Sequence, residues 1–233
     1  MERLLDCTVK AVASVFAPGM LRIFVLSVIV ALAALFLFIT GMTAAAAALA
    51  GSLAMDSALS AWLPWLTGFG ATLLAYFFFP AIMPLVVNFF DSTIASLIEA
   101  KDYPHVVPIN PPFWPELAHD VRFSLTAIAL NILVLPLYFV PLINLFVFYA
   151  LNGHLLGKEF FVMVARRHQP LADALALRRA HSRTIFIAGI LLTICATIPV
   201  LNLFAPFWGI AVMTHLYHSL PGTSRAQILK PLP

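Results

Sequence analysis

Charged residues are spaced so widely along this chain that four long stretches contain none: 23–55, 57–90, 123–157 and 184–224. Each stretch is mostly apolar and exceeds the roughly 20 residues that an α-helix needs to cross a hydrocarbon core of about 30 Å. The pattern predicts an all-α, polytopic membrane protein. Composition agrees, because 62% of the residues are hydrophobic and 10% are charged, whereas soluble domains carry about 25% charge.

A seven-residue pattern occurs twice, as VPLINLF at 140–146 and as IPVLNLF at 198–204. Proline lacks a backbone donor and clashes with the preceding turn, so a helix must break near Pro141 and again near Pro199. Such breaks persist in a bilayer only where protein or water satisfies the freed backbone groups, and paired breaks often mark a transport site.

The charge of the segment between these copies indicates how they are placed. Residues 158–183 hold six Lys and Arg against two acids, a net charge of +4, which places this connection in the cytoplasm by the positive-inside rule. If the earlier spans begin and end inside, 123–157 and 184–219 must each leave the cytoplasm and return. We therefore expect two proline-broken helical hairpins, re-entrant or hemi-spanning. Two simple spans are the alternative.

The N-terminal segment 1–17 predicts an amphipathic helix lying in the membrane interface. Its polar residues share one helical face and its large apolar residues another: Glu2, Arg3, Asp6, Lys10 and Ser14, against Leu5, Val9, Val12 and Phe16. A plain cytoplasmic lead-in is the alternative.

We expect the whole chain, 1–233, to form one integral membrane domain. Its further parts are predicted as two long transmembrane helices over 22–101, a proline-rich loop over 102–122 and a tail over 220–233. Pro80 and Pro84 predict kinks in the second long helix.

Three segments resemble a known family: 17–24 (APGMLRIF), 151–161 (LNGHLLGKEFF) and 198–206 (IPVLNLFAP). In order and spacing they resemble the bacterial CysZ-type sulfate permeases, part of the etoposide-induced membrane protein superfamily. The resemblance implies sulfate uptake across the bacterial inner membrane for cysteine biosynthesis. It also implies a fold with two long helices and two helical hairpins.

In that family a Gly-x-Arg type turn opening the first long helix is associated with sulfate binding. The matching positions are Gly19, Met20, Leu21 and Arg22. Relatives place two adjacent basic residues here, whereas this chain has only Arg22. A Pro-Gly pair before a long helix also exposes free N–H groups and the positive end of the helix dipole, which favour an anion. The alternative is an interfacial arginine that reaches lipid headgroups.

Asn144 and Asn202 each follow a proline break by three residues. We expect them to cap the second arm of each hairpin, with direct contact to a permeating ion as the alternative.

The sequence gives little indication of a nucleotide, metal or proton-transfer site. The segment 153–159 (GHLLGKE) lacks the spacing and the Ser or Thr of a phosphate-binding loop, so no nucleotide cofactor is expected. His215 and His218 share a helical face, but two histidines without a nearby carboxylate do not predict a metal site. Proton transfer by these histidines and His154 is a minor alternative.

The leading hypothesis is a sulfate transporter, not an enzyme, because no acid, base and nucleophile converge in any apolar stretch. A membrane scaffold or accessory protein is the main alternative, and an integral-membrane enzyme is third. Expected partners are sulfate, the lipid bilayer and further copies of the chain, since short hairpins need neighbours to cover their surfaces. No nucleic-acid partner is expected.

Overall fold

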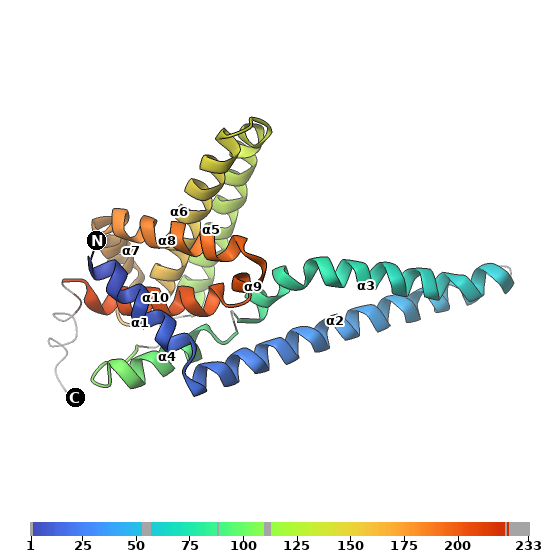
Figure 1. Ribbon diagram of the computed structural model, residues 1–233, viewed down its shortest axis with the longest axis horizontal. Coiled ribbons are helices and arrows are strands. Elements are labelled where there is room, and N and C mark those ends of the chain that lie inside the picture. Colours follow the sequence, from blue (N-terminus) through green and yellow to red (C-terminus); the bar gives the residue numbers. More distant parts are fainter. Residues whose placement is uncertain (1, 53–56, 88, 110–112, 222, 224–233) are drawn as a thin grey trace. The chain divides into compact units, whose positions relative to one another are not determined.

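A computed structural model describes residues 2–52, 57–87, 89–109, 113–221 and 223, which form helices and turns (Figure 1). The helices in chain order are α1 (Glu2–Val15), α2 (Pro18–Ser52), α3 (Ser57–Val87), α4 (Asp91–Asp102), α5 (Phe113–Val134), the 3₁₀ helix η1 (Leu135–Phe139), α6 (Ile143–Ala165), α7 (Leu171–Ala180), α8 (Ser182–Thr197), α9 (Pro199–Asn202) and α10 (Ala205–Ser219). The chain forms two compact units, residues 21–90 and the remainder, so the boundary falls inside α2 after Met20.

The 21–90 unit contains the two long helices that the sequence predicts. α2 has 35 residues and α3 has 31, and α3 is one helix through Pro80 and Pro84. The two approach closely at Gly68, where an added Cβ would lie 2.8 Å from Cγ2 of Thr43. Small residues let helix backbones come together in this way.

The core of the other unit is α10, which is apolar on nearly all sides. Its buried side chains include Phe207, Ile210, Met213, Leu216 and Tyr217. α1, α4, α6 and α8 pack around it. A helix that is hydrophobic all round is stable only where neighbours cover every face, so α10 organises this unit.

Three glycines set the crossing of α6 and α8. A Cβ on Gly189 of α8 would overlap the carbonyl oxygen of Gly153 and lie 2.8 Å from the backbone nitrogen of Gly157. A Cβ on Gly157 would lie 2.6 Å from the carbonyl oxygen of Ile185. Gly153 and Gly157 do not match a phosphate-binding loop. They instead give α6 a face of small residues, which lets α8 approach closely.

The break at Pro141 forms as predicted. η1 ends at Phe139, Val140 is extended, and α6 begins at Ile143. Leu142 turns the chain with φ at 68°, a backbone region that is unfavourable for side chains with a Cβ.

This strained turn yields a stability prediction. We expect Leu142→Gly to raise the free energy of unfolding by about 1 kcal/mol, because glycine adopts positive φ without the Cβ clash. Leu145→Gly, in the regular part of α6, should lower it by about 1 kcal/mol. Titration with SDS in mixed micelles measures both, and equal losses in the two variants would contradict the strain.

The break at Pro199 also forms as predicted. α8 ends at Thr197, the short helix α9 covers Pro199–Asn202, and α10 begins at Ala205. At about 1.5 Å per residue, the 16-residue α8 and the 15-residue α10 are shorter than a hydrocarbon core of about 30 Å. The second hairpin therefore has the short arms that the sequence predicts.

The first hairpin has longer arms than expected. α5 begins at Phe113, inside the segment 102–122 that we predicted as loop, and α6 continues to Ala165 inside the predicted connection. Pro115 is accommodated in the first turn of α5, where its missing N–H would have no intrahelical partner. α6 rises about 34 Å over its 23 residues, but it is not among the helices that are apolar enough to cross a bilayer.

The remaining polar segments are helical as well. Asp91–Asp102 forms α4 as a separate helix, and 10 residues of the basic connection, Leu171–Ala180, form α7. α7 and α8 meet at an angle of 89°. Because α7 carries Arg178 and Arg179 in its last turn, the bend separates a basic helix from the apolar α8.

α1 is amphipathic as predicted, but it has two separate apolar faces. Leu4, Cys7 and Ala11 are buried, on a helix that packs against α10. The face predicted to meet the membrane stays exposed, with Leu5, Val9, Val12 and Phe16. This exposed apolar face supports the prediction that α1 lies in the membrane interface, which remains a prediction.

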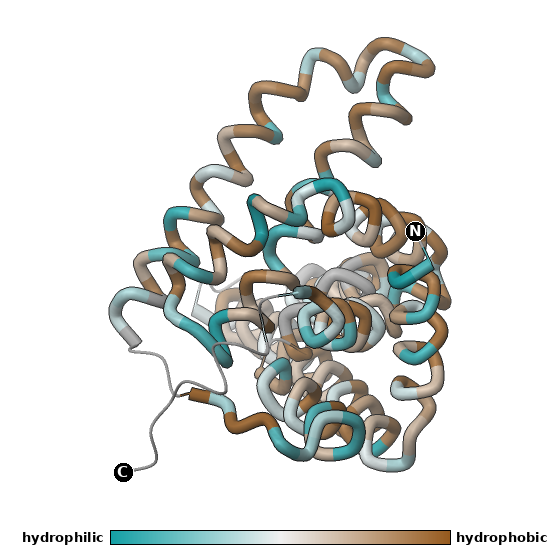
Figure 2. Tube along the Cα trace, turned by 90° about the vertical axis from the view of Figure 1, so that its left-hand side faces the viewer, coloured by the Kyte–Doolittle hydropathy of each residue, from teal (hydrophilic) through white to brown (hydrophobic). Residues whose placement is uncertain are grey.

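Apolar surface is extensive where a membrane is expected. Within the described residues, Pro18–Ser52 and Leu117–Phe139 are long and apolar enough to cross a bilayer, and the α7–α8 pair would add a bent third span. The α5–α6 pair projects at the top of Figures 1 and 2, and its upper turns are mostly hydrophobic. Its exposed apolar side chains include Leu125, Ile128, Ile132, Leu133, Phe139, Leu145 and Phe146.

Candidate functional site

The first turn of α2 has the features of an anion site. Pro18 is the first helical residue, followed by Gly19 and Met20. The N–H groups at the start of an α-helix have no intrahelical acceptor, and they lie at the positive end of the helix dipole. Ala17, just before the helix, has no side-chain oxygen that could cap them.

A cavity of about 160 Å³ lies beside this turn. Ser14, Ala17, Gly19 and Met20 line one side, and α4 lines the other with Leu97, Ile98 and Lys101. Lys101 brings a cation to the cavity, and sequence reasoning missed it because Lys101 is 82 positions from Gly19. An added Cβ on Gly19 would lie 3.5 Å from the methyl carbons of Leu97, an ordinary contact.

The four predicted sulfate-binding residues differ in their surroundings. Gly19 is half-buried at the cavity wall, and the side chain of Met20 is buried. Leu21 and Arg22 belong to the other unit, and both are exposed. Of the four, Gly19 and Met20 therefore line the cavity, and a role for Arg22 in anion binding remains a prediction.

The two asparagines do not cap their helices. The N-caps of α6 and α10 are Leu142 and Phe204, and within the described residues neither helix has a side-chain cap hydrogen bond. Asn144 lies in the first turn of α6, where its N–H donates to the carbonyl of Val140 at 3.0 Å. Asn144 lies inside α6, two residues after its N-cap, and Asn202 is the last residue of α9, two residues before the N-cap of α10.

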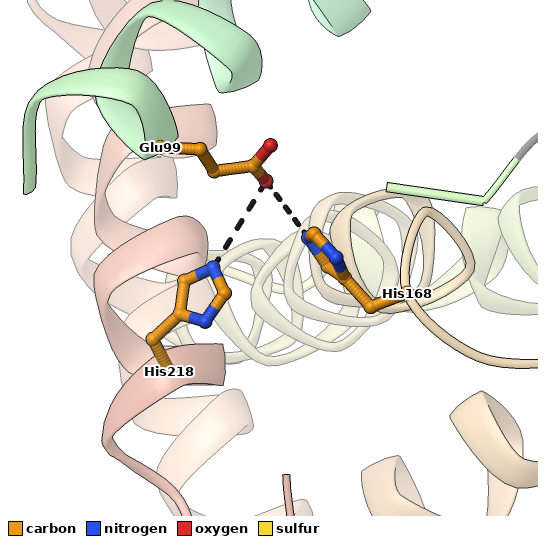
Figure 3. Close-up of side chains that lie close together, drawn as sticks. All are labelled: Glu99, His168 and His218. Atoms are coloured by element: carbon orange, nitrogen blue, oxygen red, sulfur yellow. Dashed lines mark hydrogen bonds and ion pairs between the residues drawn. The ribbon is translucent and has the colours of Figure 1, made fainter. Parts of the chain in front are cut away.

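A buried ionic network is centred on Glu99 of α4. Arg167 Nη2 donates to Oε2 of Glu99 at 2.9 Å. His168 Nε2 lies 2.8 Å from Oε1 of Glu99 (Figure 3). His218 Nε2 lies 4.0 Å from Oε1, which is longer than a hydrogen bond. The side chain of Glu99 is only 4% exposed, so this carboxylate depends on its partners.

Aromatic rings hold both imidazoles of the network. His218 stacks on Tyr103 with ring centroids 4.1 Å apart, and His168 stacks on Tyr217 at 5.1 Å. Because each ring is packed on a neighbouring aromatic face, the orientation of the histidines toward Glu99 is fixed by packing as well as by charge.

Two opposing effects set the ionisation of Glu99. Burial by itself raises the pKa of this carboxyl. The hydrogen bond from His168 and the nearby His218 and Arg167 outweigh burial, and they hold the pKa well below its ordinary value of 4.5. Glu99 is therefore a carboxylate at neutral pH, and it counterbalances the buried Arg167 guanidinium.

The sequence carried a signal for Glu99 that our reading did not use. Glu99 follows Ile94, Ala95 and Ile98 at helical spacing, and all four are buried on one face of α4. A lone acid on an apolar helical face predicts a buried ion pair. Its partners, in contrast, were not readable, because Arg167 and His168 lie nearly 70 positions away.

His215 forms a second polar junction. Its Nδ1 is 2.9 Å from the Tyr103 hydroxyl, and its Nε2 is 3.2 Å from the Ser14 hydroxyl. Since both ring nitrogens are engaged, His215 ties α1 and the segment after α4 to α10. This arrangement favours a structural role over the proton transfer that we considered for His215.

In the structure, the carboxylate of Glu99 lies near His218, which the sequence alone did not indicate. The potential ligand atoms of Glu99, His168 and His218 lie within 4.8 Å of one another, a donor set that Zn²⁺ uses. However, Arg167 and His168 already satisfy Glu99, and the Arg167 guanidinium opposes a divalent cation. The contacts therefore favour an ion-pair network.

Fold and sites together define a helical integral membrane protein with proline-broken helices and no recognisable cofactor motif in its sequence. The family described as sulfate transporter CysZ/etoposide-induced protein 2.4 matches residues 7–206. The chain belongs to this family, which is a transporter family rather than an enzyme family. Among curated proteins, none matches the chain significantly.

Proposed function

We propose that this protein is a multi-pass sulfate permease of the bacterial inner membrane, which takes up sulfate for cysteine biosynthesis. The observation that carries the proposal is the cavity at the start of α2 in a chain of the sulfate transporter family. Sulfate is a dianion, and a helix N-terminus with a nearby cation suits it electrostatically.

In this proposal the anion is bound by the N–H groups of Gly19 and Met20, which have no intrahelical acceptor. Lys101 supplies charge from α4. Arg22, three residues after Gly19 in the same helix, would add a forked pair of donors.

The proposed path for the ion runs along the two hairpins, near Asn144 and Asn202. The exposed apolar side chains of the α5–α6 pair require lipid or another copy of the chain as cover. We therefore include a homo-oligomer in the proposal, in which symmetry completes the path.

The test is uptake of labelled sulfate into proteoliposomes. Arg22→Ala and Lys101→Gln should each lower the uptake rate at limiting sulfate about tenfold or more, because each removes a charged donor worth about 1.5–3 kcal/mol. Lys10→Gln is the matched control, since Lys10 pairs with Asp6 on the exposed side of α1, and it should stay within about twofold of wild type.

Two outcomes would contradict the proposal in different ways. Unchanged sulfate affinity in both variants would remove the anion site from the start of α2. Absence of any protein-dependent flux in the wild type would favour the scaffold or accessory role instead.

A further inference from the structure

A second cavity of the same unit is strongly basic. It has a volume of about 370 Å³ and lies among α5, α6 and α7. Four cations line it, Arg122, Lys158, Arg178 and Arg179, and the described lining includes no acidic residue. Like charges gathered in one cavity repel one another, so an anion bound there would be stabilising.

Two neighbouring cations have acidic partners. Arg166 pairs with Asp120, and Arg167 pairs with Glu99. In the part of the chain that the structure describes, no ion pair involves the four cavity cations. Arg178 Nε is moreover buried without a hydrogen-bond partner there, and Lys158 Nζ lies 4.9 Å from the centre of the Phe123 ring.

An apolar stripe on α5 extends along the helix from the face that lines the cavity. Phe123 and Thr126 line the cavity, and Leu130 and Leu133 follow at helical spacing on the same face. Leu133 is 73% exposed. The site thus combines a cationic end with an adjoining hydrophobic surface that no described segment covers at Leu133.

We propose that this cavity binds the phosphate headgroup of an anionic phospholipid, whose acyl chains lie along Leu130 and Leu133 of α5. Arginine guanidinium groups bind phosphate oxygens in a forked geometry. A free inorganic anion would use the cations alone and would gain nothing from the stripe. The paired basic and apolar surfaces therefore favour a lipid.

The expected membrane position fits this ligand. Three of the four cations belong to the connection 158–183, which the positive-inside rule places in the cytoplasm. The cytoplasmic leaflet carries anionic headgroups that attract basic segments next to the membrane. The proposal does not depend on which ion the protein transports.

The test uses delipidated full-length protein in neutral detergent, with binding of phosphatidylglycerol and phosphatidylcholine measured by native mass spectrometry. Wild type should prefer phosphatidylglycerol. Arg122→Gln with Arg178→Gln should weaken phosphatidylglycerol binding about tenfold or more and leave phosphatidylcholine binding unchanged. Arg3→Gln with Arg183→Gln removes the same net charge outside the cavity, and it should stay within about twofold of wild type.

A second arm tests the stripe separately from the charge. Leu133→Ser should weaken phosphatidylglycerol binding while leaving the weak binding of glycerol 3-phosphate unchanged. Equal phosphatidylglycerol affinity in wild type and the cavity variant would overturn the proposal. So would glycerol 3-phosphate or sulfate binding as tightly as the lipid, because the cavity would then be a site for free anions.

Discussion

Replacing Gly189 by alanine is expected to lower the free energy of unfolding by about 3 kcal/mol or more, a large loss for one methyl group. The new Cβ would overlap the Gly153 carbonyl oxygen and crowd the Gly157 nitrogen. These are backbone atoms in the middle of α6, so no side-chain rotation relieves the contact. The helices must move apart, which also disrupts their neighbours in a close-packed core.

Gly70→Ala is the matched control, because Gly70 lies inside α3 and an added Cβ there has no described atom within 4 Å. It should leave stability unchanged or raise it by up to about 1 kcal/mol through helix propensity. SDS titration in mixed micelles measures both variants. A Gly189→Ala protein as stable as wild type would mean that α6 and α8 do not cross at this glycine.

Glu99→Gln is expected to cost about 3 kcal/mol, the second large effect. The substitution keeps the shape of the side chain but removes the charge that compensates Arg167, whose side chain is only 14% exposed. Removing one partner of a buried pair leaves the other charge desolvated and unpaired. Arg167→Gln in the Glu99→Gln background should recover part of the loss, because it removes that unpaired charge.

Asp120→Asn provides the comparison at the surface. Asp120 pairs with Arg166 at 2.8 Å, but its side chain is 53% exposed, and exposed pairs contribute about 1 kcal/mol or less. Measured in the same titration, Glu99→Gln should be several times more costly than Asp120→Asn. Equal effects would show that the Glu99 network is hydrated rather than buried.

Glu99 also has a functional consequence through α4. This helix presents Lys101 to the cavity beside α2 and Glu99 to the buried network. Its position against the segment after α6 therefore depends on the ion pairs that Glu99 makes with Arg167 and His168. We expect Glu99→Gln to lower sulfate uptake as well as stability, whereas Asp120→Asn should lower neither appreciably.

The helix breaks were predictable because their causes are local. Proline removes a backbone donor and crowds the preceding turn, so Pro141 and Pro199 favoured both turns, although α3 continues through Pro80 and Pro84. Hairpin lengths were less predictable, because the loop ends at Phe113 rather than near Arg122. A proline-rich composition indicated a loop there, but Pro115 fits the first turn of a helix as readily as it fits a loop.

Parts of the candidate sites were also predictable from local sequence, and other parts were not. The start of α2 follows from Pro18 and Gly19 alone, as does the exposed apolar face of α1. The capping role of Asn144 and Asn202 was inferred from spacing, and it failed because a cap depends on the backbone angles of the turn. Those angles place Leu142 and Phe204 at the caps instead.

The sequence by itself determined that this is a helical membrane protein with two proline breaks and an anion-suited helix start. Transfer of apolar side chains from water and the covalent geometry of proline act on short segments, so their effects can be read locally. Only the tertiary structure decided that Lys101 joins the α2 cavity, that Glu99 neutralises Arg167, and that Gly153, Gly157 and Gly189 form one helix crossing. These contacts join residues that are tens of positions apart, and they exist only because particular helices pack against one another.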